Sequence, residues 1–205
     1  MESAPNSDEP IKSTDERNLS WGRKFFELRD YTPIPLIILL FVYNTACVLS
    51  VVVGLLMVML GELIRVYSVG FIGSISRTRK DRTGGKLIQD GPFSFVRNPL
   101  YVGNFFIATG IAVFGGHVGL IFLTIALFVT QYFFIVTYEE DLLKKTFGEE
   151  YMSYCQKVPA WFPSKKFELE NLQWPDNFSP AIKSETKTLM TIFAIIFILT
   201  IQASI

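Results

Sequence analysis

Two short stretches hold most of the residues whose types and spacing could do chemistry. The first is the loop 84–103, GGKLIQDGPFSFVRNPLYVG, which lies between two strongly apolar segments. Gly91-Pro92 marks a turn, Asn98 suits the N-cap of a following helix, and Pro99 suits the first helical turn. Backbone N–H groups at such a helix start favour a bound anion or carboxylate. The pattern predicts a ligand site where the chain enters a membrane.

The second stretch is Glu139-Glu140, at the end of the apolar segment 118–138. The short turn 115–117 joins that segment to the apolar segment 100–114, so the two are expected to be antiparallel helices. Asn98 and Tyr101 would then lie at the same depth as Glu139. Such a site could hold a zwitterion, with the helix start facing its carboxylate and Glu139, Tyr101 or Phe93 offsetting its positive charge.

Composition narrows the class of protein. Half of the 205 residues are apolar and they occur in clusters, which indicates an integral membrane protein. Lys+Arg and Asp+Glu both total 19, so net charge gives no reason to expect a nucleic-acid partner. The single histidine, His117, excludes a multi-histidine metal site, and no metal is expected. The length suits one domain.

The elements that must position the two stretches are predicted to be helices. Residues 1–20 suit a disordered tail, and the mixture of aromatic and basic residues around Trp21 suits an interfacial helix. The apolar run 34–69 would be about 54 Å long as one helix, against a hydrocarbon core of about 30 Å. It is therefore expected to break near Tyr43-Asn44-Thr45 into a hairpin.

Further apolar segments follow at 100–114, 118–138 and 188–203, and the last is marginal in length for a span. Leu143, Phe147, Tyr151 and Tyr154 have helical spacing, which predicts an amphipathic helix continuing out of the membrane. The expected fold is an all-α, polytopic membrane bundle with about five transmembrane helices and a cytosolic amphipathic helix. Its parts are a tail (1–20), an interfacial helix and hairpin (21–69), a core (70–163), and a linker with a last helix (164–205).

Charge placement orients this bundle. The N-tail, the connection 70–98 and the segment 139–185 hold most of the Lys and Arg residues, whereas the turns 43–46 and 115–117 hold none. This positive-inside asymmetry predicts a multi-pass protein of an inner membrane or the endoplasmic reticulum, with a cytosolic N-terminus. Glu62 and Arg65, three residues apart on one helix, are either an ion pair at the boundary or a functional pair.

The two stretches together resemble the membrane methyltransferases of the isoprenylcysteine carboxyl methyltransferase and phospholipid methyltransferase group. The first half of the shared pattern stands here as Leu87-Ile88-Gln89-Asp90-Gly91-Pro92-Phe93 and Arg97-Asn98-Pro99-Leu100-Tyr101-Val102-Gly103. The second half stands as Glu139-Glu140, Leu143, Phe147-Gly148, Tyr151, Tyr154, Val158-Pro159 and Pro163. The resemblance covers residues 60–163, with the two motifs in register.

The resemblance implies S-adenosylmethionine as the cofactor, bound at the cytosolic face and enclosed by the C-terminal helix. Glu139, Tyr101 and Asn98 would be the catalytic residues, with Glu139 on the substrate side. The acceptor would be a lipid or a prenylated small molecule from the bilayer. By position, the cofactor-binding residues would be Gly85, Lys86, Leu87, Ile88, Phe93, Asn98, Pro99, Leu100 and Tyr101.

The acceptor group could be a carboxyl, an amine or a thiol. A carboxylate nucleophile needs no base, whereas an amine or thiol must lose a proton, for which Glu139 is the candidate base. Proximity and exclusion of water would supply most of the rate effect.

Three positions depart from the family pattern. Asn98 stands where the family has His, and an amide cannot titrate. Phe93 replaces a common Tyr. Ile135 stands where the carboxyl methyltransferases carry an Arg, four residues before the glutamate, which argues against a prenylcysteine carboxylate as the acceptor.

Two other functions remain open. One is a non-catalytic membrane scaffold or assembly protein with the same fold, which the substitutions at Asn98 and Ile135 favour. The other is a NADPH-dependent membrane lipid reductase, although such reductases are usually longer.

Overall fold

The structure is a computed structural model that describes residues 14–72, 86–163, 173–175 and 178–203. These residues form seven α-helices and one 3-10 turn, η2. In chain order the elements are α1 (Thr14–Leu28), α2 (Ile34–Val42), α3 (Val48–Ile72), η2 (Gly91–Ser94), α4 (Pro99–Phe114), α5 (Val118–Phe147), α6 (Glu149–Lys157) and α7 (Ser179–Ala203).

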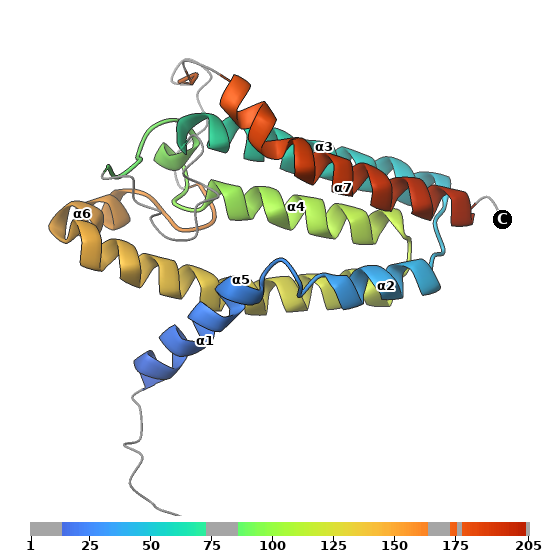
Figure 1. The fold of residues 1–205 in the computed structure, drawn as a ribbon, viewed down its shortest axis with the longest axis horizontal. Helices are drawn as coiled ribbons and strands as arrows, with labels where there is room; N and C mark the ends of the chain where they lie inside the picture. Colours follow the sequence, from blue (N-terminus) through green and yellow to red (C-terminus); the bar gives the residue numbers. More distant parts are fainter. Residues whose placement is uncertain (1–13, 73–85, 164–172, 176–177, 204–205) are drawn as a thin grey trace, which may run out of the picture.

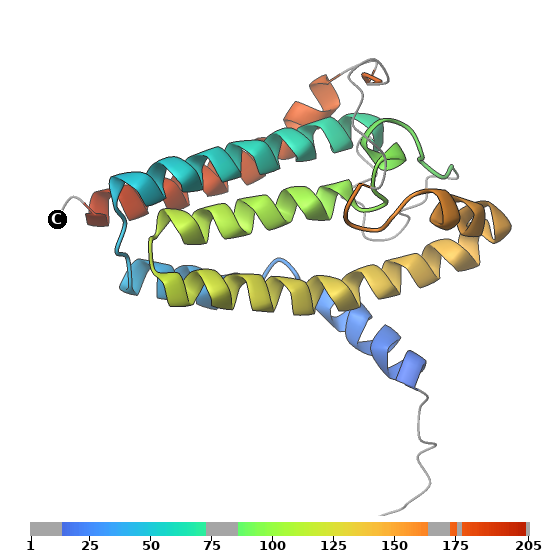
Figure 2. The same cartoon turned by 180° about the vertical axis from the view of Figure 1, so that it is seen from behind.

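The long helices α3, α4, α5 and α7 run side by side along the long axis of the molecule, with α4 between α3 and α5 (Figures 1 and 2). The short α2 lies beside the first half of α5, and α1 leaves the bundle obliquely (Figure 1). Helix α6 and the loop that precedes α4 lie at one end of the bundle, and the C-terminus lies at the other. The loop and α6 are thus brought together although they are far apart in the sequence.

Among the described residues, three helices are long and apolar enough to cross a membrane, within Val48–Ile72, Val118–Phe147 and Ala181–Gln202, and α4 is a shorter apolar helix. Their outward faces carry exposed apolar side chains such as Val48, Leu49 and Phe122, which suits contact with lipid. The last apolar run is therefore long enough to span as part of α7. The nine-residue α2 rises only about 14 Å, so the expectation of about five spanning helices is wrong for this helix.

Small residues let α3 and α4 approach closely. A Cβ atom on Gly61 would lie 2.6 Å from the carbonyl oxygen of Gly103, and one on Gly54 would lie 2.6 Å from the backbone nitrogen of Phe114. Glycines at such positions allow helix backbones to contact directly in a membrane bundle. This contact fixes the start of α4, and hence the end of the loop, against α3.

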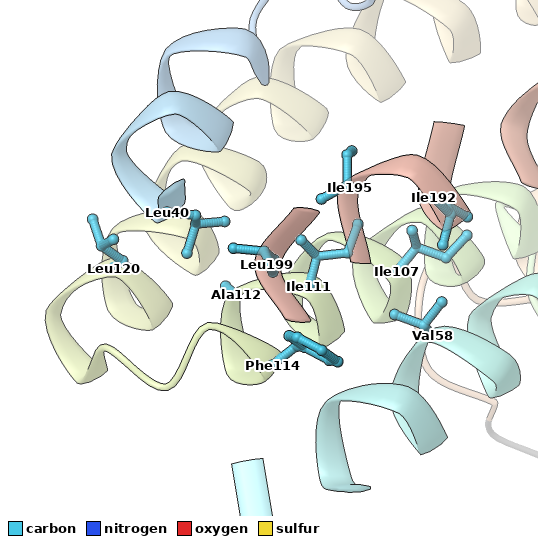
Figure 3. Close-up of a cluster of buried hydrophobic side chains, with 10 residues drawn as sticks. All are labelled: Leu40, Val58, Ile107, Ile111, Ala112, Phe114, Leu120, Ile192, Ile195 and Leu199. Carbon is cyan, nitrogen blue, oxygen red and sulfur yellow. The ribbon is translucent and has the colours of Figure 1, made fainter. Parts of the chain in front are cut away.

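Behind this contact, an apolar core joins α2, α3, α4, α5 and α7. Figure 3 shows its buried side chains, Leu40, Val58, Ile107, Ile111, Ala112, Phe114, Leu120, Ile192, Ile195 and Leu199. Leu40 and Leu199 are almost fully buried, so both α2 and α7 are held against the central helices. The core lies toward the end of the bundle away from α6 (Figures 1 and 3).

The predicted break in the first hairpin is confirmed, because α2 ends at Val42 and α3 begins at Val48. Three boundaries differ from the expectation. Residues 14–20, assigned to the tail, belong to α1, and α7 begins at Ser179, inside the expected polar linker. The helix predicted to continue through Phe147 and Tyr151 is interrupted at Gly148, whose φ of +54° ends α5. Residues 1–13, 73–85, 164–172, 176–177 and 204–205 lie outside the described residues.

Candidate active site

A cavity of about 930 Å³ lies between the loop before α4 and the helices of the bundle. Its polar end is lined by the loop, by Glu139 of α5 and by Tyr151 and Tyr154 of α6. Its apolar end reaches Leu40 of α2 and Ile195 of α7. The cavity therefore joins the charged end of the bundle to the apolar interior.

Tyr101 and Glu139 meet at the polar end of this cavity. The hydroxyl group of Tyr101, in the first turn of α4, donates a hydrogen bond of 2.5 Å to Oε1 of Glu139 near the end of α5. The expectation that these residues lie at the same depth is confirmed. The hydrogen bond holds one oxygen of the Glu139 carboxylate beside the start of α4.

Asn98 precedes α4 as expected, and its backbone oxygen accepts hydrogen bonds from Tyr101 and Val102. Within the described residues, however, its side chain makes no capping hydrogen bond, so the predicted side-chain cap is wrong. The amide nitrogen instead donates to the carbonyl oxygen of Ala160, at 3.3 Å. Asn98 thus ties the start of α4 to the segment that follows α6, while its side chain lines the cavity.

The other predicted cofactor-binding residues also surround the cavity. Its lining includes Lys86, Leu87, Ile88, Phe93, Pro99, Leu100 and Tyr101, whereas Gly85 lies outside the described residues. Lys86 is exposed, and Leu87 and Phe93 are buried. Lys86 is one of the cationic side chains that line this largely apolar pocket, and such a lining suits an amphiphilic ligand with an anionic group.

The side chain of Arg97 ties the loop to α5 and to the end of α6, and this role was not predicted from the sequence. Its Nε and Nη2 atoms donate to Oε1 of Glu140 at 3.0 and 2.8 Å, and its Nη1 donates to the carbonyl oxygen of Val158 at 2.7 Å. Burial acts to lower the pKa of Arg97, but the hydrogen bonds and the charge of Glu140 outweigh it and raise the pKa above its ordinary value. The sequence did hint at this ion pair, because Arg97 and Glu140 are the charged neighbours of Asn98 and Glu139.

Helix α6 packs against the loop and covers one side of it. The hydroxyl group of Tyr154 donates to the carbonyl oxygen of Phe93 at 2.6 Å, and Leu87, Tyr151, Tyr154 and Val158 form one buried cluster. Burial raises the pKa of both tyrosines well above the ordinary value. Both hydroxyl groups are therefore neutral hydrogen-bonding groups over the physiological pH range, and the loop is shielded from water on this side.

A second polar cluster lines the cavity wall closer to the core. Nη2 of Arg65 lies 2.6 Å from Oε2 of Glu185, and Nε of Arg65 lies 3.7 Å from Oε2 of Glu62. The guanidinium of Arg65 also donates to Oδ1 of Asn104. The ion pair expected between Glu62 and Arg65 is confirmed. The contact of Glu185 with Arg65 was not predicted, because Glu185 lies 120 residues after Arg65 in the chain.

Ile135, four residues before Glu139, is fully buried and packs with Phe26, Tyr101 and Val136. It is not part of the cavity lining that the structure describes. A guanidinium at this position would have to enter an apolar cluster, which costs free energy unless it is paired.

Comparison with known sequences identifies the family. A sequence model of the phospholipid methyltransferase family matches residues 49–150. The chain is 34% identical over 117 residues to protein-S-isoprenylcysteine O-methyltransferase of Rattus norvegicus, covering 54% of this chain and 40% of that protein. The corresponding protein of Saccharomyces cerevisiae is 32% identical over 130 residues, covering 60% of this chain and 53% of that protein.

The nickel-cobalt-cadmium resistance protein NccN of Alcaligenes xylosoxydans xylosoxydans is 32% identical over 82 residues, covering 40% of this chain and 38% of that protein. No solved structure matches the chain. The chain thus aligns with about two fifths of the length of the rat and NccN proteins and about half of the yeast protein. The matched region contains the loop, the α4–α5 hairpin and the Glu139-Glu140 pair, and this chain belongs to the phospholipid methyltransferase family of membrane proteins.

Proposed function

We propose that this protein is an S-adenosylmethionine-dependent methyltransferase that methylates a lipid-like acceptor reached from the bilayer. The observation that carries this proposal is the shape and lining of the cavity. One end presents Lys86, Asn98, Tyr101 and Glu139, and the other is apolar. A volume of about 930 Å³ is at the upper end of the range for small-molecule sites, which leaves room for an acceptor beside a cofactor.

The residues present fit this cofactor. Bound there, S-adenosylmethionine would supply a methyl group on a positively charged sulfur. The start of α4 and the ammonium group of Lys86 suit a carboxylate. The ring of Tyr101 and the carboxylate of Glu139 suit a neighbouring cation.

Glu139 is the residue best placed to act on an acceptor. Its carboxylate lines the cavity and accepts the hydrogen bond from Tyr101. If the acceptor group is an amine or a thiol, Glu139 can hold the proton that the nucleophile loses. Tyr101 fixes the carboxylate, while the α6 cluster and the loop exclude water.

The apolar end of the cavity supports an acceptor with a hydrocarbon chain. Ile37 and Leu40 of α2, Ile107 and Ile111 of α4, and Ile192 of α7 line this part. Burying such a chain stabilises the complex by about 0.8 kcal/mol per methylene group.

We also propose that the polar end of the cavity faces the cytosol. Lys86, Arg97, Lys144, Lys145 and Lys157 lie on the loop, the end of α5 and α6. The opposite connections, 43–47 and 115–117, carry neither Lys nor Arg. The positive-inside rule then favours the cytosolic side of an inner membrane or of the endoplasmic reticulum for the loop and α6.

The test is transfer of a tritiated methyl group from S-adenosylmethionine to extracted membrane lipids by purified protein in vesicles. We expect label in the organic phase with the wild type, and a loss of roughly 100-fold for Glu139→Gln if the acceptor needs a base. Glu149→Gln, at an exposed position of α6, is the matched control. Folded protein that binds the cofactor and labels no lipid would contradict the lipid acceptor. Folded protein that binds no cofactor would favour a scaffold.

A further inference from the structure

A chain of hydrogen bonds crosses the cavity wall from α3 to α5. The guanidinium of Arg65 donates to Oδ1 of Asn104, and Nδ2 of Asn104 donates to the hydroxyl oxygen of Tyr132 at 3.0 Å. Arg65, Asn104 and Tyr132 all line the cavity. None of the three belongs to the loop motif or to the Glu139-Glu140 motif.

The chemistry of these groups fixes the direction of every hydrogen bond. A guanidinium can only donate, so Asn104 must turn its oxygen toward Arg65 and its NH₂ group toward Tyr132. The Tyr132 oxygen is then an acceptor. Among the described residues its hydrogen-bond partner is Asn104, and the one proton of the hydroxyl group is left to donate elsewhere.

The ring of Tyr132 is held firmly. It stacks on Phe128 with a centroid distance of 4.0 Å and an interplanar angle of 16°, and it makes an edge contact with Tyr101 at 4.8 Å. The contact with Tyr101 places Tyr132 next to the Tyr101–Glu139 pair. A hydroxyl group that is oriented in advance and lines a cavity can bind a ligand atom at little entropic cost.

We infer that Tyr132 donates a hydrogen bond to a neutral carbonyl oxygen of the acceptor lipid, and that Arg65 and Asn104 are positioning residues that aim its proton. This inference rests on the proposed lipid acceptor and names one feature of it. The oxygen is inferred to be neutral because the one positive charge of Arg65 faces two carboxylates, Glu185 at 2.6 Å and Glu62 at 3.7 Å. Arg29, which also lines the cavity, pairs with Asp30 at 3.5 Å. Among the described residues, the wall around Tyr132 therefore has no unpaired positive charge that would favour a phosphate or a carboxylate.

The experiment measures the bond itself, without methyl transfer or cofactor. The probe is methyl palmitate with a ¹³C-labelled carbonyl, bound to purified protein in detergent and observed by infrared difference spectroscopy. A hydrogen bond lowers the carbonyl stretching frequency. We expect the lowered band in the wild type and in Tyr138→Phe, the matched control on the same helix and outside the cavity lining.

Two variants should lose the lowered band for different reasons. Tyr132→Phe keeps the ring and removes the proton. Asn104→Asp keeps the contact with Arg65 but turns an accepting oxygen toward Tyr132, so the proton of that hydroxyl group is redirected to the new carboxylate. Binding of the ester, followed with radiolabel, should weaken roughly fivefold in both variants. Binding of heptadecane, which has no oxygen, should not change.

An unchanged carbonyl band in Tyr132→Phe would overturn the inference, as would the absence of saturable ester binding to the wild type. Tighter binding of sodium palmitate than of the methyl ester would contradict the inference that the bound oxygen is neutral. Tyr132→Phe is nearly isosteric, so the test does not depend on the folding of Asn104→Asp. Each of these results is separate from a failure to bind S-adenosylmethionine, which would count against the proposed function alone.

Discussion

Glu139 and Glu140 are neighbours in the sequence, but their carboxylates contact different elements. Glu139 accepts a hydrogen bond of 2.5 Å from the hydroxyl group of Tyr101 on the cavity wall, and Glu140 accepts one of 2.8 Å from Arg97 beneath the loop. Glu139 therefore faces the cavity, while Glu140 holds the loop that lines it.

This division predicts opposite phenotypes for the same substitution. Glu140→Gln should lower stability by about 2 kcal/mol because it removes the charge from a hydrogen-bonded ion pair, which is roughly 4–8 °C in Tm for a chain of this size. Glu139→Gln should keep Tm within about 1 °C of the wild type, since an amide oxygen can still accept from Tyr101. Thermal unfolding and methyl transfer, measured together, check this. A large fall in Tm for Glu139→Gln with normal activity would contradict the assignment.

Tyr154 gives a prediction about alkaline pH. Burial raises its pKa above the ordinary value of 10.0, so its neutral form is favoured in the folded protein. Its contribution to stability is fully present below pH 10 and is lost as the pH rises toward the raised folded value. Tyr154→Phe should cost about 1–3 kcal/mol, because it leaves the buried carbonyl of Phe93 without this donor.

Absorbance at 295 nm, compared between the wild type and Tyr154→Phe, isolates the phenol of Tyr154. We expect it to ionise only as the protein unfolds. Ionisation near pH 10 in folded protein would show that this hydroxyl group is accessible to water.

The glycine contact between α3 and α4 predicts a steric effect. In Gly54→Ala the new Cβ atom would lie 2.6 Å from the backbone nitrogen of Phe114, so the helices must separate. We expect a loss of about 1–3 kcal/mol, measured as Tm in detergent. Gly119→Ala is the control, because its Cβ atom would meet only the side chain of His117, at 3.1 Å. That control should be neutral or up to about 1 kcal/mol more stable, and equal losses in both variants would refute the packing argument.

His117 lies at the opposite end of the bundle from the proposed chemistry. Its Nδ1 atom accepts a hydrogen bond from the backbone N–H of Leu120 at 3.3 Å and caps the start of α5. His117→Ala should therefore cost about 1 kcal/mol of stability and leave activity unchanged, while His117→Asn should restore the cap. Loss of activity in folded His117→Ala would place this residue in the chemistry instead.

The sequence was sufficient for features that follow from local patterns and from connectivity. Hydropathy located the helices and the break after Val42. The tight turn before His117 made α4 and α5 antiparallel, which brought Tyr101 to Glu139. By contrast, the positive φ of Gly148 could have been suspected from the residue type, but the helical spacing of Phe147 and Tyr151 continues across it.

Features that depend on contacts between distant segments could not be predicted. Glu185 reaches Arg65 only because α7 packs on α3, and no periodicity links positions so far apart. The Asn98 side chain was expected at the start of α4, yet it bonds to Ala160 because the segment after α6 folds back over the loop. The orientation of Tyr132 could not be predicted either, because it depends on how α3, α4 and α5 are placed relative to one another.

The most direct test of the central claim is calorimetric binding of S-adenosylmethionine to purified protein in detergent, with NADPH as the comparison ligand. We predict saturable binding of S-adenosylmethionine at micromolar concentration, on the order of −8 kcal/mol, and none of NADPH. Asn98→Ala should weaken that binding, since it releases the start of α4 from Ala160. Folded protein that binds neither ligand, or binds NADPH alone, would contradict the account.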